Sequence, residues 1–305
     1  MEKEKNFISA VAYMHNDSGR VAPFLTRITN ELNKRFDTYE IILVNDACKD
    51  ASVAQAKAFA ASCEIKAPIT IINMSIYQGL ELCMNAGLDL AIGDFVYEFD
   101  TMSLCYECEK LSEAYNKSLD GNDIVSVSPS KCRNSASSLF YKLFNITSHS
   151  KYKLHTDIFR VLSRRAINRV HSITANMPYR KAAYAASGLS MATIYTSKEQ
   201  TDGEPAPRFS LAVNSLALYT DAAYRLSLGI SFAMLTAAVL EIIYTVCIYF
   251  GGTKPIEGWT TTMMVLSFGF FGIFLVLALV IKYLSLLVDL IFKKQKYLVE
   301  GIEKI

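Results

Sequence analysis

The stretch Gly79 to Met102, GLELCMNAGLDLAIGDFVYEFDTM, combines the two kinds of element that decide the fold. Its first half has the apolar spacing of a helix from about residue 80 to residue 91, and FVYEF (Phe95 to Phe99) is an apolar strand after a short turn. This strand carries Glu98 and is followed by Asp100. Charges in a buried strand are costly unless they are paired. The segment therefore predicts a buried strand whose carboxylates have a specific task.

The same alternation of strands and helices continues on both sides of this segment. It predicts an α/β fold with a mostly parallel, doubly wound sheet, in which ligands bind beyond the carboxyl ends of the strands. We expect further strands at Ile8 to Ala12, Ile41 to Val44, Ile69 to Met74 and Ile124 to Val127, and further helices at about residues 23–36, 51–63 and 107–118.

Composition limits the classes of function. A formal net charge of +2 over 305 residues argues against a nucleic-acid-binding protein. The N-terminus lacks the long apolar run of a signal peptide, and the seven cysteines are an odd number with irregular spacing, as in a reducing compartment. Cys105 and Cys108 have no second pair or nearby histidine to complete a zinc site. We therefore expect the soluble part of the chain to lie in the cytoplasm.

Two apolar runs near the C-terminus are each long enough to span a bilayer, namely 226–250, interrupted by Glu241, and 262–281. Basic residues flank the pair of runs on both sides, whereas only Lys254 lies between them. This bias predicts a hairpin of two transmembrane helices in the cytoplasmic membrane, with both ends and the soluble part facing the cytoplasm. An ionisable residue within a span is a functional candidate, but a protonated carboxyl in a helix contact explains Glu241 equally well.

The segment before the first run has the pattern of an amphipathic helix. It predicts an interfacial helix lying on the membrane, and an ordinary helix packed on the soluble part is the alternative. The expected organisation is a catalytic domain over 1–207, a juxtamembrane helix over 208–225, two transmembrane helices within 226–292 and a cytoplasmic tail over 293–305.

Polar residues gather where the predicted strands end. His15 and Asp17 follow the first strand, Asp46 follows the second, and Asp100 and Thr101 follow the fourth. An acidic rim of this kind suits a divalent cation or the donor groups of a nucleotide. Asp and Asn are also ordinary turn and helix-capping residues, so each cluster alone is a weak signal.

Four segments together resemble one known family. The run Ile8 to Asp17 and YEIILVNDACKD (Tyr39 to Asp50) resemble the opening strand and nucleotide-binding loop of family 2 glycosyltransferases of the GT-A fold. Gly79 to Met102 resembles their helix, strand and DxD motif, and FRVLSRRAINRV (Phe159 to Val170) is similar to an element of the membrane-anchored polyprenyl-phosphate glycosyltransferases. The resemblance implies transfer of a sugar from a nucleotide sugar, with a preference for a uridine diphosphate carrier, to a membrane polyprenyl phosphate.

The resemblance also implies roles for individual residues. Asp46 matches the family's base-holding position, and the implied nucleotide-binding set is Tyr13, His15, Asp17, Asp46, Asp100 and Thr101. The implied catalytic set is Asp100, Asp157 and Arg160. The acceptor phosphate would be held by Arg133, Arg160, Arg164 and Arg208, while Arg164 also fits a basic face near anionic headgroups. A homo-oligomer is left open.

The chain departs from the family pattern at several positions. Ile158 replaces the aspartate before Phe159, so Asp157 is displaced by one residue. Ala47 stands where the family has glycine, and Met102 replaces the second aspartate of DxD. We expect a weak site for Mg²⁺ or Mn²⁺ at Asp100, tolerant of Met102→Asp.

Three roles remain open for Glu98. It shares a face of its strand with Asp100, so it could replace the missing metal ligand or support Asp100 from behind. It could instead pair with a basic residue such as Arg133. The altered motif also fits a catalytically weakened scaffold subunit, whereas a processive synthase would need more spans and a QxxRW motif that this chain lacks.

Overall fold

The computed structural model describes residues 3–62, 67–130, 141–142, 145–146, 152–173, 179–198, 229–230, 232–233, 236, 240, 258–292 and 297–305. The chain divides into two compact units. The first comprises residues 1–215 together with 295–305, and the second comprises residues 216–294. The interfacial helix expected over 208–225 and Glu241 lie outside the described residues.

The first unit alternates strands and helices, as the sequence predicts. Its N-terminal half contains β1 (Ile8–Met14), α1 (Val21–Arg35), β2 (Tyr39–Asn45), α2 (Ser52–Ser62), β3 (Ile69–Met74), α3 (Leu80–Leu90) and β4 (Phe95–Phe99). The following half contains α4 (Glu109–Leu119), β5 (Ile124–Pro129), β6 (Phe159–Ser163), α6 (Arg164–Ile173), α7 (Arg180–Ala186), β7 (Met191–Thr196) and, at the C-terminus, β8 (Val299–Lys304).

All eight strands form one sheet with the order β7-β5-β6-β4-β1-β2-β3-β8. The central strands β3, β2, β1 and β4 are parallel, as expected. In contrast, β6 lies antiparallel to both β4 and β5, and β8 lies antiparallel to β3. The sheet is therefore mixed, because β6 and β8 run in the opposite direction to their neighbours.

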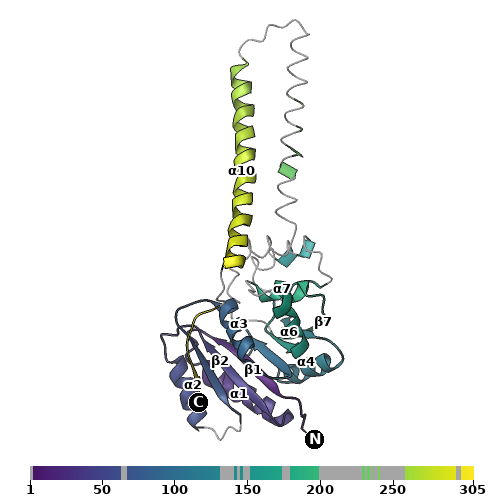
Figure 1. Cartoon of the computed structure of the whole chain (residues 1–305). Coiled ribbons are helices and arrows are strands. Elements are labelled where there is room, and N and C mark those ends of the chain that lie inside the picture. The colour runs from purple at the N-terminus through teal and green to yellow at the C-terminus, as the bar shows by residue number, and fades with distance from the viewer. Residues whose placement is uncertain are drawn as a thin grey trace. The chain divides into compact units, whose positions relative to one another are not determined.

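Helices cover both faces of this sheet (Figure 1). On one face, Phe24 of α1 packs edge-on against Phe99 of β4, with ring centroids 5.2 Å apart. On the other face, Gly87 of α3 lies so close to β1 that a Cβ atom there would be 2.3 Å from Val11. Because side chains alternate along a strand, Glu98 and Asp100 point to the face opposite to Phe99, which is the face that α3 covers.

An aromatic core lies on the α1 face, beyond the end of β4. Tyr106 packs against Phe159 at 4.8 Å between centroids, and Phe99 packs against Phe159 at 5.5 Å. Met102 is 1% exposed and belongs to this core. The residue that replaces the second aspartate of the DxD motif is thus a core residue, and its burial argues against the expectation that Met102→Asp is tolerated.

The tail assigned to residues 293–305 also differs from its prediction. Its last residues form β8, which extends the sheet beyond β3 and ends with the amide of Ile305 bonded to the carbonyl of Ile69 at 2.9 Å. Residues 299–304 of the predicted tail are therefore an edge strand of the first unit.

The second unit contains α10 (Trp259–Phe292), a helix of 34 residues. Over the residues that the structure describes, no helix meets the length and apolar character that a membrane crossing requires. The transmembrane hairpin stays a prediction.

Candidate nucleotide and catalytic site

The loops after β1 and β2 bring four of the predicted nucleotide residues together. The hydroxyl of Tyr13 donates to Asp46 at 2.9 Å, and Nδ1 of His15 lies 2.7 Å from the carbonyl oxygen of Asp46. The amide of His15 donates to the carboxylate of Asp17 at 3.0 Å. Burial raises the pKa of Asp17 above its usual value. Parallel strands place these loops at one edge of the sheet, as expected.

Asp46 has a structural role in addition to the one that the sequence suggests. Its side chain is fully buried. It accepts hydrogen bonds from the backbone amides of Gln78 and Gly79, at 2.7 and 2.8 Å, in addition to the one from the hydroxyl of Tyr13. A buried carboxylate with three donors is stabilised as part of the protein framework. Asp46 therefore fixes the start of α3, and its contact with a nucleobase stays a prediction.

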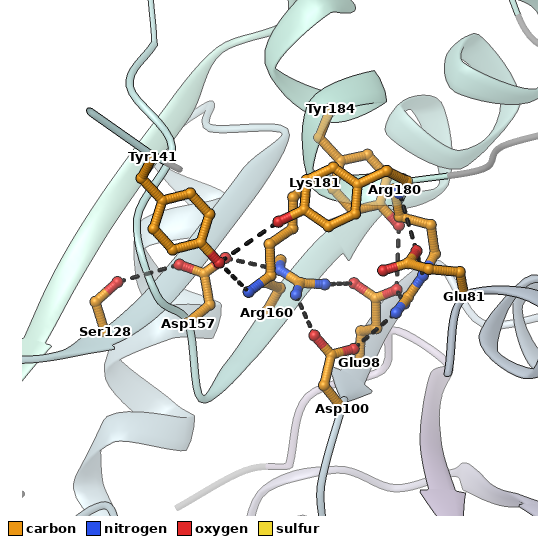
Figure 2. A network of polar contacts seen from close by, with 11 residues as sticks. Glu81, Glu98, Asp100, Ser128, Tyr141, Asp157, Arg160, Arg180, Lys181 and Tyr184 are labelled. Carbon is orange, nitrogen blue, oxygen red and sulfur yellow. Dashed lines mark hydrogen bonds and ion pairs between the residues drawn. The ribbon is translucent and has the colours of Figure 1, made fainter. Parts of the chain in front are cut away.

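A second cluster lies where β4 ends, built on two arginines (Figure 2). Arg160 of β6 donates to both Glu98 and Asp100. Arg180 of α7 also donates to both, with 2.9 Å to Asp100. The side chains of all four residues are at most 4% exposed. The register of β4 with β6 sets Arg160 directly beside Glu98, so the antiparallel pairing supplies one of these contacts.

Further groups complete the surroundings of the two arginines. Asp157 accepts from Arg160 at 3.0 Å and from Ser128 at 3.2 Å. Although burial lowers the pKa of Arg160, the carboxylates of Asp100 and Asp157 raise it well above its usual value. Tyr184 donates to Glu98 at 3.2 Å, and burial raises the pKa of its hydroxyl to about 12. These contacts offset the cost of burying the charge of Arg160.

The first turn of α3 joins the two clusters. Gly79, the residue that caps α3, donates its amide to Asp46 in the nucleotide loop. Two residues later, the carboxylate of Glu81 accepts hydrogen bonds from the backbone amide and from Nε of Arg180, both at 2.9 Å. The predicted nucleotide residues and the predicted catalytic residues thus form one continuous polar site.

The carboxylates at the DxD position do not fit a metal site held by the protein. Both oxygens of Glu98 and both oxygens of Asp100 accept hydrogen bonds from guanidinium groups. Met102 offers no oxygen and lies in the core. Among the residues described, no group of three His, Cys, Asp or Glu side chains could hold a metal ion. The predicted ligation of Mg²⁺ or Mn²⁺ by Asp100 and Glu98 is therefore not supported by this arrangement.

The other predicted residues fall in different places. Arg164 donates to the backbone carbonyls of Ala91 and Gly93, at the end of β4 away from Asp100, so the structure does not bring it together with the other predicted catalytic residues. Thr101 follows Asp100, as expected, and its hydroxyl accepts from the amide of Ser103 at 3.2 Å. Arg133 and Arg208 lie outside the described residues.

Reasoning from the sequence missed three residues of the site, namely Arg180, Glu81 and Tyr184. The available signal was the buried acidic pair itself, because two buried carboxylates require two cations. One of these cations, Arg160, was placed in the site by resemblance. The other, Arg180, lies 80 residues beyond Asp100 in a short helix whose position depends on the tertiary fold.

The comparisons identify the family. The profile of the Glycosyl transferase family 2 matches residues 9–186, and the chain belongs to this family. An uncharacterized glycosyltransferase of Synechocystis is 26% identical over 63% of this chain and 61% of its own length. A second one, YkcC of Bacillus subtilis, is 21% identical over 97% of this chain and 94% of its own. A prophage bactoprenol glucosyl transferase homolog of Escherichia coli is 26% identical over 53% of this chain and 54% of its own. The chain thus spans less than two thirds of the Synechocystis and Escherichia coli relatives.

Solved structures share the fold. A mannosyltransferase of Pyrobaculum calidifontis, solved with GDP-Man and Mn²⁺, has a TM-score of 0.52 at 16% identity, covering 96% of this chain and 89% of its own. Glucosyl-3-phosphoglycerate synthase of Mycobacterium tuberculosis, solved with Mn²⁺, UDP-Glc and phosphoglyceric acid, has a TM-score of 0.54 at 12% identity over 70% of this chain and 78% of its own. These similarities confirm the GT-A type of α/β fold predicted from the sequence.

Proposed function

We propose that this chain transfers a sugar from a nucleoside diphosphate sugar to a polyprenyl phosphate, giving a polyprenyl-phosphate sugar for cell-surface glycan assembly. The observation that carries the proposal is the continuous polar site at the carboxyl end of the sheet, in which α3 joins the Asp46 loop to Asp100 and Arg160. The bactoprenol glucosyl transferase relative supports the lipid acceptor. A uridine diphosphate donor is our preferred assignment.

The chemistry requires little from a general base. An acceptor phosphate is already an anion, so one of its oxygens attacks the anomeric carbon, and the bond from that carbon to the nucleotide's diphosphate oxygen breaks. The electron pair leaves with the nucleoside diphosphate, and no proton has to be removed from the nucleophile. The protein must therefore position the two substrates and balance negative charge.

Two buried arginines, Arg160 and Arg180, stabilise the site through ion pairs with its carboxylates. Arg160 and Arg180 are each 1% exposed and are paired with carboxylates, so they position Asp100 and do not present free charge to a substrate. We assign the acceptor phosphate to Arg133 and Arg208, the remaining arginines of the predicted set. Paired hydrogen bonds from arginine suit a phosphate well.

We further propose that the chain lies in the cytoplasmic membrane with the catalytic unit facing the cytoplasm. The support is the pair of apolar runs with their basic flanks. Large apolar side chains of α10 are also exposed, among them Phe268, Ile273 and Phe274 at more than 60%. Labelling a cysteine introduced at Gly252 from outside intact cells tests this topology. Labelling only after permeabilisation contradicts it.

The activity is tested with purified full-length protein in detergent. The protein is incubated with polyprenyl phosphate and a panel of radiolabelled nucleotide sugars, with Mg²⁺, with Mn²⁺ and with chelator. We expect label in the organic phase with one donor, and none when polyprenol without phosphate replaces the acceptor. Label that stays in the aqueous phase with every donor contradicts the proposal.

One observation favours a second candidate, a scaffold subunit in a membrane glycan-assembly complex. The carboxylates of the altered DxD motif are neutralised by arginines, and Met102 is buried in the core. A scaffold retains the fold and binds a partner without turnover. The same assay separates the two candidates, because a scaffold releases no labelled lipid in any condition.

A further inference from the structure

Leu298, the residue just before the C-terminal strand β8, contacts the loop that starts α3. The backbone of Leu298 and the side-chain amide of Gln78 bond to each other twice, with the amide of Leu298 donating to Oε1 at 2.9 Å and Nε2 donating to the carbonyl at 2.7 Å. The amide of Ser75 donates to the same carbonyl at 3.2 Å. The side-chain amide of Gln78 thus both donates to and accepts from the backbone of Leu298, and these two bonds hold the loop of Gln78 against Leu298.

The opposite side of Gln78 faces the nucleotide loop. Its backbone amide donates to Asp46 at 2.7 Å, and the amide of Gly79 follows at 2.8 Å. Tyr77, the residue before it, is 45% exposed and has its ring 4.7 Å from the ring of His15. The loop 75–79 is thus held between β8 and Asp46, with Tyr77 beside a predicted nucleotide residue.

Three more contacts hold β8 in place. Tyr297, just before the strand, donates its hydroxyl to Asp89 of α3 at 2.9 Å. Within the strand, Glu303 accepts from Asn73 of β3 at 3.0 Å and pairs with Lys57 of α2 at 2.5 Å. These side-chain contacts to α2, α3 and β3 define the register of β8, in addition to its backbone pairing with β3. This is more than is needed to cover a sheet edge, for which a short charged strand suffices.

We propose that β8 completes the donor-nucleotide site, with Gln78 as a positioning residue that transmits its docking to the Asp46 loop. This inference rests on the proposed function, since it concerns the nucleotide that the site binds. The segment that leaves the catalytic unit at residue 215 returns to it at residue 295, and its last strand sets the geometry of loop 75–79. Undocking of β8 therefore lowers affinity for the nucleotide without removing any residue that contacts it.

The test uses full-length protein in detergent and calorimetric titration with uridine diphosphate and, separately, guanosine diphosphate. Gln78→Ala removes both hydrogen bonds to Leu298, and Leu298→Pro removes the amide that donates to Gln78. Leu298→Ala is the matched control, because it keeps that amide and truncates a side chain that is 43% exposed. We expect Gln78→Ala to weaken affinity about tenfold, Leu298→Pro to weaken it less, and Leu298→Ala to leave it unchanged.

Hydrogen exchange and melting temperature separate positioning from a general loss of stability. In Gln78→Ala and Leu298→Pro we expect faster exchange at residues 75–79 with little change in melting temperature. Wild-type affinity in both variants overturns the inference and leaves the proposed function standing. If the wild-type protein binds neither nucleotide, the proposed function fails, and the inference fails with it.

Discussion

Arg160 and Arg180 come from different elements, yet each donates one hydrogen bond to Glu98 and one to Asp100. The result is a closed ring of two guanidinium groups and two carboxylates in the interior. Of the three roles left open for Glu98, charge pairing is the one observed, with Arg160 and Arg180 as its partners. The charge of each side chain in the ring is neutralised only while its partners are present.

Removing one arginine leaves buried negative charge unpaired. Arg180→Met keeps most of the side-chain volume, and we expect it to lower the free energy of unfolding by roughly 3–5 kcal/mol. The exposed Arg169 of α6 provides the control, since Arg169→Met removes a surface charge and should change stability little. Urea denaturation measures both variants. If Arg180→Met lowers the free energy of unfolding as little as the control does, the ring is not formed.

Met102 gives an independent test of the altered motif. Met102→Asp buries a carboxylate in the aromatic core, and we expect it to cost roughly 3–5 kcal/mol of unfolding free energy. Met102→Leu keeps an apolar side chain of similar volume and should cost less than about 1.5 kcal/mol. The melting curves of the two variants decide the question. A stable Met102→Asp protein would show that this position can face a ligand.

Much of the fold follows from local pattern. The strands β1 to β5 and the helices between them were predictable because a strand and an amphipathic helix differ in apolar period. Glu98 and Asp100 could be placed on one face for the same reason. The position of Asp46 at the end of β2 also follows directly from the sequence.

Contacts between distant segments were not predictable. The strand β8 is short and charged, and it becomes a strand only by pairing with β3, about 230 residues earlier in the chain. The same holds for Arg180, whose partners Glu81, Glu98 and Asp100 lie 80 to 99 residues away. The burial of Asp46 depends on the loop before α3, so its structural role could be seen only in the tertiary structure.

The arginine ring predicts weak metal binding by the protein alone. Titration of Mn²⁺ into nucleotide-free protein should give no saturable heat and no shift in melting temperature, because the oxygens of Glu98 and Asp100 already accept from guanidinium groups. The matched measurement repeats the titration after addition of uridine diphosphate, whose own oxygens bind metal. Stoichiometric binding without nucleotide would contradict the assignment.

The pair of Asp123 and Arg165 predicts a dependence on pH. Hydrogen bonds from Arg165 lower the pKa of Asp123, and a depressed pKa in the folded protein means that the carboxylate stabilises the fold above its unfolded pKa near 4. This contribution is lost as pH falls through the folded value. We expect Asp123→Asn to melt up to about 3 °C below wild type at pH 7 and with a smaller difference at pH 3. An equal difference at both pH values would exclude this linkage.

Ala47 has a positive φ of 50°, at the position where the sequence departs from the family's glycine. The left-handed conformation costs an L-residue with a side chain roughly 1–2 kcal/mol, whereas glycine adopts it freely but loses about 0.5–1 kcal/mol of chain entropy on folding. Ala47→Gly should therefore raise the free energy of unfolding by up to about 1 kcal/mol and leave nucleotide affinity intact. Ala58→Gly, at an exposed position within α2, is the control and should lower it by about 0.5–1 kcal/mol. If both substitutions destabilise the protein equally in urea, the loop after β2 does not hold Ala47 in a strained conformation.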